Sequence, residues 1–123
     1  AVTQLTSTSE DVMHKELLIE ESMENTVLHY ARNTKIAGLG GIVCSPLEAA
    51  IVKKALGEDF ITITPGIRLP DAIVDDQARF TSPAQARKIG TDYIVVGRPI
   101  TRAEDPVNAY YRFYHDFMGT NQA

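Results

Sequence analysis

Short apolar segments alternate with helical segments along this chain, and this alternation constrains the fold more than any other feature. The predicted strands cover residues 1–6, 42–44, 60–64 and 93–96. Helical segments are predicted over 9–36, 45–57 and 82–90, and from 105 onward. Strands separated by helices pair in parallel with right-handed crossovers, so the order predicts four parallel β/α units in one α/β domain over residues 1–123. The alternation alone is compatible both with half of a closed barrel and with a small doubly wound sheet.

Local helix signals support this order. Ser45-Pro46-Leu47-Glu48 and Ser82-Pro83-Ala84-Gln85 each place serine at an N-cap, proline in the first turn and a capping-box residue three positions after the serine. Gly90 suits the end of the second of these helices, and Asp105-Pro106 predicts the start of a last helix. The last helix has an aromatic face that we expect to pack in the core, formed by Tyr110, Tyr111, Phe113, Tyr114 and Phe117.

Composition excludes several classes of function. The formal net charge of −4 argues against the basic surface that nucleic acids or acidic membranes require, so neither is predicted as a partner. A single cysteine and a start without a signal-like apolar stretch favour the cytoplasm, and no apolar run reaches the length of a membrane span. His14, His29 and His115 lie far apart without metal-ligand spacing, so no metal site is predicted.

The segment 95–101 carries the best-supported binding site. A predicted strand ends in Gly97-Arg98, and a helix start follows. Gly97 has no Cβ, so its backbone can approach an anion closely, and Arg98 can clamp the same anion through charge-assisted hydrogen bonds. The following helix would turn its positive end toward that point. The pattern predicts a phosphate site, although an exposed arginine after a strand is the alternative at this stage.

Several motifs, taken in order along the chain, resemble one enzyme family. They are Leu5-Thr6-Ser7, Val43-Cys44-Ser45, Thr64-Pro65-Gly66-Ile67-Arg68, Asp76-Gln77, Gly97-Arg98-Pro99-Ile100-Thr101 and Asp105-Pro106. Together they resemble the C-terminal half of bacterial orotidine 5'-phosphate decarboxylase, the last enzyme of de novo UMP synthesis. The resemblance runs through essentially the whole chain. The Pro-Gly-Ile-Arg, Asp-Gln and Gly-Arg-Pro elements are specific as a set, although Gly-Arg alone is weak.

The resemblance implies a fold and a division of labour. The family is a (β/α)8 TIM barrel of about 250 residues, whereas this chain has 123. We therefore expect the C-terminal half of such a barrel, with the N-terminal half of the same enzyme as its missing partner. The family's catalytic Asp-x-Lys-x-x-Asp array does not occur here, so we expect no catalytic residue in this chain. The resemblance further implies no cofactor, orotidine 5'-monophosphate and UMP as ligands, and a homodimeric native enzyme.

The phosphate side of the site is carried over from the resemblance. In the family, the positions of Gly97 and Arg98 hold the 5'-phosphate of the nucleotide. Gln77 matches a lid glutamine that bridges the pyrimidine and the phosphate, a task that suits an amide with one acceptor and two donors. Arg68 matches a position counted among the nucleotide-binding residues. Viewed without the family, Gln77 is a solvated loop residue and Arg68 an exposed loop charge.

The base side of the site is expected at the ends of two other strands. Thr6 matches a family position that hydrogen-bonds the pyrimidine, although Thr3 and Ser7 remain open as alternatives one register away. Pro65 is expected to stiffen the mouth of its strand and to shape the pocket wall near the base. Cys44 is expected to be a small buried residue rather than a nucleophile.

Two readings from other classes stay open. The chain can be a stand-alone phosphate- or nucleotide-binding module of flavodoxin-like type. It can also be a half-barrel scaffold that self-associates, because half a barrel has two open strand edges and an uncovered inner face. Related barrels that act on sugar phosphates share the strand-Gly-Arg site but do not pair it with Thr-Pro-Gly-Ile-Arg and a glutamine lid, so they rank below the decarboxylase family.

Overall fold

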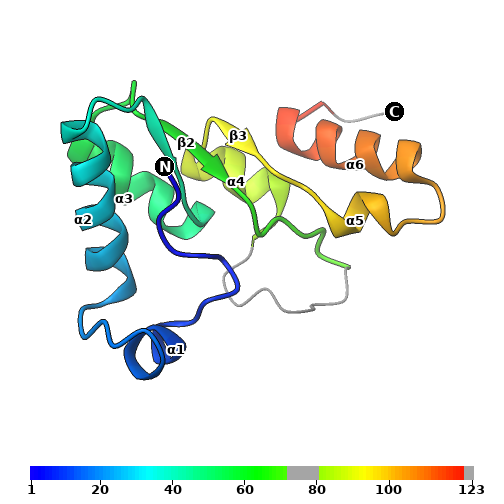
Figure 1. Ribbon diagram of the computed structural model, residues 1–123. Coiled ribbons are helices and arrows are strands. Elements are labelled where there is room, and N and C mark those ends of the chain that lie inside the picture. Colours follow the sequence, from blue (N-terminus) through cyan, green and yellow to red (C-terminus); the bar gives the residue numbers. More distant parts are fainter. Residues whose placement is uncertain (72–80, 121–123) are drawn as a thin grey trace.

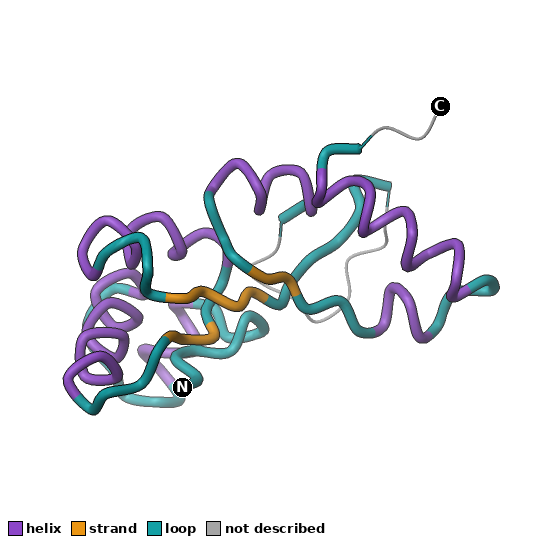
Figure 2. The backbone as a smooth tube through the Cα atoms, turned by 90° about the horizontal axis from the view of Figure 1, so that it is seen from above, coloured by secondary structure: helices purple, strands orange, loops and turns teal. Residues whose placement is uncertain are grey.

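A parallel sheet organises the computed structural model, which describes residues 1–71 and 81–120. Its strands are β1 (Gly41–Val43), β2 (Ile61–Thr64) and β3 (Tyr93–Ile94), which lie side by side in the order β1-β2-β3. Both pairings are parallel, as the alternation of strands and helices predicted. Figures 1 and 2 show α2 and α3 beside the β1 end of the sheet and α6 extending beyond β3. The α/β class is therefore confirmed for this chain.

The first predicted strand is much shorter than expected. Residues 1–6 make only an isolated parallel bridge, between Val2 and Val43 of β1. The Val43 amide donates to the Ala1 carbonyl at 2.7 Å, and the Thr3 amide donates to the Val43 carbonyl at 3.1 Å. A turn in which the Thr8 amide donates to the Leu5 carbonyl then ends the extended segment. On the β1 side, the three-stranded sheet is thus extended by this single bridge rather than by a fourth strand.

The helical region predicted over 9–36 is two helices, α1 (Glu10–Lys15) and α2 (Met23–Ile36). Leu18 interrupts it with a φ of 57°, in the left-handed region that bulky residues rarely adopt. Ser22 then caps α2, because its hydroxyl accepts a hydrogen bond from the Asn25 amide at 3.1 Å. The continuous helix was therefore a wrong prediction, since a second serine N-cap competes with propagation.

The serine-proline signals mark helix starts as predicted. Ser45 caps α3 (Pro46–Leu56), and Ser82 caps α4 (Pro83–Ile89). Each hydroxyl accepts from a backbone amide of the first turn, at 3.1 Å and 3.2 Å respectively. Gly90 ends α4 in the left-handed conformation with a φ of 99°, a position where glycine avoids the steric cost of a Cβ.

The last predicted helix is preceded by a short one. A helix of four residues, α5 (Arg98–Thr101), follows β3, and α6 (Pro106–Met118) begins after Asp105, whose carboxylate caps it. Of the aromatic residues on α6, Phe113 is buried, whereas Tyr110, Tyr111 and Tyr114 are about half exposed. Core packing was therefore a wrong prediction for the three tyrosines.

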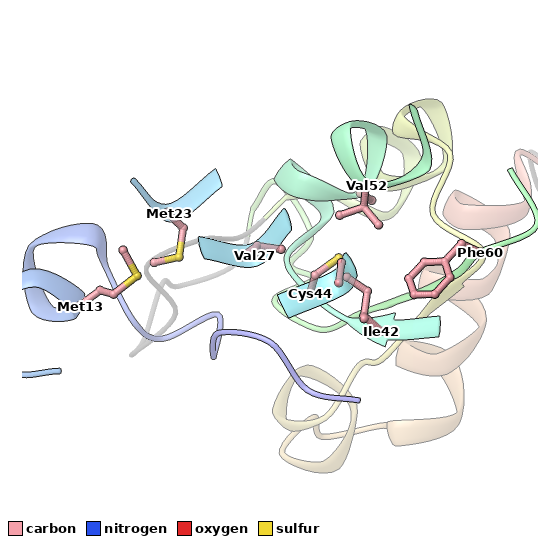
Figure 3. Close-up of a cluster of buried hydrophobic side chains, with 9 residues drawn as sticks. Met13, Met23, Val27, Ile42, Cys44, Val52 and Phe60 are labelled. Atoms are coloured by element: carbon pink, nitrogen blue, oxygen red, sulfur yellow. The ribbon is translucent and has the colours of Figure 1, made fainter. Parts of the chain in front are cut away.

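The buried apolar residues form two clusters on the described part of the chain. The larger one lies between α1, α2, α3 and β1, and Figure 3 shows its side chains converging. It includes Met13, Val27, Ile42, Val52 and Cys44, each with no more than 1% of its surface exposed. The smaller cluster joins α4 to α6 through Ala86 and Phe113. Cys44 is therefore a small buried residue, as predicted. Among the described helices, none has the length and apolar character needed to cross a membrane.

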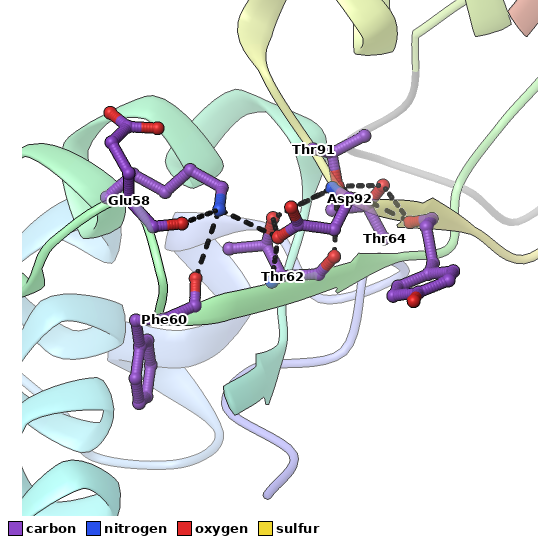
Figure 4. Close-up of polar contacts among 8 residues, drawn as sticks. Glu58, Phe60, Thr62, Thr64, Thr91 and Asp92 are labelled. Atoms are coloured by element: carbon purple, nitrogen blue, oxygen red, sulfur yellow. Dashed lines mark hydrogen bonds and ion pairs between the residues drawn. The ribbon is translucent and has the colours of Figure 1, made fainter. Parts of the chain in front are cut away.

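An ion pair between a buried lysine and a partly exposed aspartate ties α3 to the amino end of the sheet (Figure 4). The Lys53 ammonium lies 2.7 Å from the Asp92 carboxylate and also donates to the carbonyls of Glu58 and Phe60, at 2.9 Å and 3.1 Å. Only 5% of the Lys53 side chain is exposed, against 34% for Asp92. Three acceptors surround the ammonium, which compensates for its loss of hydration.

Threonine hydroxyls extend this network across the sheet. The Thr62 amide donates to the Asp92 carboxylate at 2.9 Å. The Thr91 hydroxyl lies 3.2 Å from the Thr62 hydroxyl and 3.0 Å from that of Thr64. Burial acts to raise the pKa of Asp92, but the hydrogen bonds from Lys53 and the Thr62 amide and the charge of Lys53 outweigh it and hold the pKa below its ordinary value of 3.8.

We predict that Lys53→Met destabilises the fold by about 1–3 kcal/mol, the cost of leaving buried hydrogen-bonding groups without their donor. Denaturant unfolding measures the change in the free energy of unfolding. Lys54→Met is the matched control, because Lys54 is the next residue on the same helix and is exposed. Equal losses in the two variants would mean that the ion pair contributes nothing beyond an exposed lysine.

We also predict that the contribution of Asp92 depends on pH. Its pKa in the folded state is lowered, so its stabilising effect is fully present above the unfolded value, about 3.9, and is lost as the pH falls through the folded value. The stability gap between the natural chain and Asp92→Asn should therefore shrink as the solution is acidified through this range. Urea unfolding of both proteins across the range measures the gap, and a gap that does not change with pH would contradict the assignment.

Candidate functional site

The carboxyl ends of the parallel strands meet at one edge of the sheet, which we call the carboxyl edge. Ser45 lies just after β1, Pro65 directly after β2, and Gly97 a short distance beyond β3. The segment that holds Thr6 runs past the same edge after its bridge to β1. Because α/β folds place ligands at the carboxyl ends of their strands, this edge is the candidate binding site.

Gly97 and Arg98 sit where the sequence placed them, at the junction of β3 and a helix. Gly97 is exposed, and a Cβ built on it would meet no atom within 4 Å. Arg98 is half-buried and forms the first residue of α5. The helix is shorter than expected: with four residues, it has too few aligned peptides for a substantial macrodipole. An anion here would depend on backbone amides and the Arg98 guanidinium rather than on a long helix.

Arg68 lies at the end of the neighbouring strand and is not an exposed loop charge. Only 7% of it is exposed, and its Nη1 donates to the carbonyl of Ile67 at 2.8 Å. The backbone around it is fixed by a bridge between Ile67 and Thr81, where the Arg68 amide donates to the Thr81 carbonyl at 3.0 Å. Pro65 is half-buried just before Gly66, whose φ of 78° turns the chain. This strand end is therefore held by backbone hydrogen bonds to Thr81 and brings a positive charge to the carboxyl edge.

The three candidate hydroxyls near the first bridge differ in their surroundings. Thr6 is buried, with 6% exposed, whereas Ser7 is exposed. The Thr3 hydroxyl donates to the Val43 carbonyl at 2.8 Å, so it is engaged with the backbone of β1. Of the three, Thr6 is the most buried.

One residue at this edge was missed in the sequence. Gln4 is 9% exposed and shares the buried side of its segment with Thr6, while Leu5 between them points outward with 62% exposed. The chain bends at Gln4 and turns at Thr6, so the burial of these two side chains comes from the local turn and not from a strand. The sequence does not show this, because the polar residues lie inward and the apolar Leu5 outward.

Gln77 lies outside the described residues, as do Asp75 and Asp76. The described residues contain no group of three or more histidine, cysteine or acidic side chains that could hold a metal ion. Lys53, the most buried lysine of the described part, bonds to carbonyls that precede β2 and therefore lies at the opposite edge of the sheet. The chemistry available at the carboxyl edge is thus anion binding by two arginines and hydrogen bonding by a hydroxyl and an amide.

Comparison with known proteins places the chain in a family. The model of the orotidine 5'-phosphate decarboxylase / HUMPS family matches residues 1–113. Orotidine 5'-phosphate decarboxylase of Staphylococcus saprophyticus is 54% identical over 119 residues, which are 97% of this chain and 52% of that protein. The protein of the same name from a Geobacillus species is 52% identical over 119 residues, 97% of this chain and 50% of its own length.

Solved structures agree with the sequence comparison. Orotidine 5'-phosphate decarboxylase from Lactobacillus acidophilus superposes with a TM-score of 0.75 at 41% identity and covers 95% of this chain and 47% of its own. An uncharacterised conserved protein from Geobacillus kaustophilus gives a TM-score of 0.71 at 43% identity, with the same coverage of 95% and 47%. The chain spans about half the length of the relatives it matches. A family model that extends over nearly the whole chain shows that this protein belongs to the orotidine 5'-phosphate decarboxylase / HUMPS family.

Proposed function

We propose that this chain is the C-terminal half of an orotidine 5'-phosphate decarboxylase and supplies the residues that bind the phosphate and the pyrimidine. The whole enzyme would convert orotidine 5'-monophosphate to UMP and carbon dioxide. The observation that carries the proposal is the position of Gly97-Arg98 at the carboxyl edge, next to the strand end that bears Arg68, in a chain of this family.

The phosphate would lie against Gly97 and Arg98. Gly97 is exposed and has no Cβ, so an anion could approach its backbone closely. The guanidinium of Arg98 could form two parallel charge-assisted hydrogen bonds to phosphate oxygens. The net charge of −4 does not oppose this, because a local pair of arginines determines the field at the site. Gln77 would close over the ligand and bridge its base and phosphate.

The base would lie between the strand ends that bear Thr6 and Pro65. The Thr6 hydroxyl would hydrogen-bond the edge of the base, and a base without the matching group would lose that hydrogen bond. Pro65 offers a rigid wall at the end of β2. Arg68, whose guanidinium is buried beside this wall, would add positive charge between the base and the phosphate.

The decarboxylation itself would belong to the partner half. In the family that this chain resembles, the bond from C6 to the carboxylate breaks and carbon dioxide leaves. A lysine of the Asp-x-Lys-x-x-Asp array then protonates the carbanion. No such array occurs in this chain, and the reaction uses no cofactor. Binding energy gained at the phosphate would then lower the barrier at C6, so the two halves would act only together.

We predict that Arg98→Ala weakens UMP binding by about 1.5–3 kcal/mol, the range for hydrogen bonds to charged groups. Arg102→Ala is the matched control, because Arg102 ends the same helix and is exposed. Calorimetric titration of UMP into both variants and the natural chain measures the difference. Gln77→Ala should cost less, since a lid must be ordered before it contributes. Unchanged UMP affinity in Arg98→Ala would show that the phosphate does not bind at this position.

We further predict that the purified 123-residue chain does not decarboxylate orotidine 5'-monophosphate. Adding the N-terminal half of the Staphylococcus saprophyticus relative should restore turnover, because it would bring the catalytic array. The loss of substrate absorbance follows the reaction, and the N-terminal half alone is the control. Turnover by this chain without a partner would show that the catalytic groups lie in this half after all.

A further inference from the structure

A pocket lies between α4 and α6, in the layer of helices rather than at the sheet. The two helices lie side by side (Figure 1) and are joined by a hydrogen bond from the Ala84 amide to the Asp116 carboxylate at 3.1 Å. The pocket has a volume of about 500 Å³, within the range of about 300–1,000 Å³ that is typical of small-molecule sites. It is lined by Ala84, Arg87, Lys88, His115, Asp116 and Gly119. None of these six residues belongs to a strand or to the carboxyl edge.

Positive charge dominates this lining. Arg87 and Lys88 on α4 are cations, His115 on α6 can become one, and Asp116 supplies the single carboxylate of the six. Neither Arg87 nor Lys88 forms an ion pair or donates a side-chain hydrogen bond to a described residue. The chain, with its net charge of −4, thus holds a local cluster of positive charge that attracts an anion at short range.

Gly119 determines where the Arg87 guanidinium lies. It ends α6 with a φ of 71°, in the left-handed region that favours glycine. A Cβ at this position would overlap the guanidinium of Arg87. The glycine therefore lets an arginine of α4 lie across the end of α6. The amides of Gly119 and Thr120 both donate to the His115 carbonyl, so that carbonyl has its donors without the guanidinium.

The His115 imidazole is held in a defined orientation. Its Nδ1 lies 2.8 Å from the Thr120 hydroxyl oxygen. Its ring stacks on that of Tyr111, one helical turn earlier, with the centroids 6.1 Å apart and an angle of 26° between the planes. Tyr114 makes an edge contact with the same ring at a centroid distance of 5.4 Å. Nε2 has no partner among the described residues, so the ring can donate from it to a ligand when that nitrogen carries the proton.

We propose that this pocket binds a phosphate group, with Arg87 as the main contact and Lys88 and His115 beside it. An arginine presents two parallel N–H groups to phosphate oxygens, and lysine and histidine add further donors. A phosphate group suits this set, because its three terminal oxygens and its charge of about −2 can be shared among several cationic side chains. The volume also leaves room for an organic group beside the phosphate. The ligand is therefore either free phosphate or a small phosphate ester.

The first experiment follows the histidine ring signals by NMR while inorganic phosphate is added to the natural chain at constant pH and ionic strength. We expect a saturable shift of the His115 signals and none for His14 and His29. Arg87→Gln should raise the dissociation constant for phosphate at least about tenfold, the lower end of the range for hydrogen bonds to charged groups. Arg32→Gln is the matched control and should leave it nearly unchanged, because Arg32 is an exposed arginine of α2 outside the pocket.

The second experiment reverses the sign of the effect. Asp116→Asn removes the one negative charge of the lining, while the asparagine carbonyl can still accept from the Ala84 amide. Phosphate should then bind about fivefold more tightly, the order of the interaction between unit charges about 4 Å apart in water. A substitution that only loosened the two helices would weaken binding instead, and that result would contradict the proposal. Circular dichroism melting checks that all variants fold.

A third experiment separates this pocket from the carboxyl edge and identifies the source of the phosphate group. Phosphate should shift the His115 signals of Arg98→Ala as it does in the natural chain, because Arg98 does not line the pocket. UMP is titrated into the same variant. A His115 shift with UMP as well supports a site for phosphate esters, and a shift with inorganic phosphate alone supports a site for the free ion.

The absence of a saturable His115 shift with phosphate would overturn the proposal. So would equal weakening by Arg87→Gln and Arg32→Gln, because the anion would then respond to overall charge and not to the pocket. Loss of the shift in Arg98→Ala would place the bound anion at the carboxyl edge and would also overturn it. None of these outcomes requires that UMP bind at the carboxyl edge, so a failure of this proposal can be told apart from a failure of the proposed function.

Discussion

A single buried ammonium group sets the geometry on which the rest of this fold depends. Lys53 rises from α3 and reaches the Asp92 carboxylate as well as two carbonyls that lead into β2. Asp92 in turn accepts from the Thr62 amide and directly precedes β3. One side chain thereby fixes the position of a helix relative to two parallel strands. The strands are short, with four and two residues, so few ladder hydrogen bonds exist to set their register without it.

This interaction lies at the amino end of the sheet, and the candidate site lies at the other. In barrels, residues at the amino end serve stability, whereas ligands bind at the carboxyl end. The polar groups of the two ends differ accordingly. At the amino end, Lys53, Thr62 and Thr91 are buried. Lys53 donates to the Phe60 carbonyl, and the hydroxyls of Thr62 and Thr91 lie within hydrogen-bond distance of each other. Gly97 is exposed, and the space next to it is open.

The parts of the fold that follow from local chemistry could be predicted from the sequence. The caps at Ser45, Ser82 and Asp105 involve residues within one turn of the helix, so the signal and its consequence lie next to each other. The ion pair could not be found in this way, because Lys53 and Asp92 are brought together by the crossover from α3 through β2 to β3. The break at Leu18 was hidden as well, since neither glycine nor proline marks it.

The candidate site was predictable in its position and less so in its environment. The ends of strands can be read from apolar runs, which placed Thr6, Arg68 and Gly97 at one edge before any geometry was known. The burial of Arg68 could not be predicted from the sequence, because it depends on the bridge between Ile67 and Thr81. The prediction that the tyrosines of α6 pack in the core was wrong for a related reason. An amphipathic helix indicates that its apolar face is covered, but the sequence does not say by what.

That last point applies to the whole sheet. Its described interior carries buried threonines, Thr62 and Thr64, while its outer edges carry exposed Val2 and Val95. The buried threonines are tolerated because the Thr91 hydroxyl lies within hydrogen-bond distance of both, 3.2 Å from Thr62 and 3.0 Å from Thr64. The exposed valines lie at or next to the two sheet positions that have a strand on one side alone among the described residues. The environment of each residue therefore follows from its place in the sheet and cannot be read from its hydropathy.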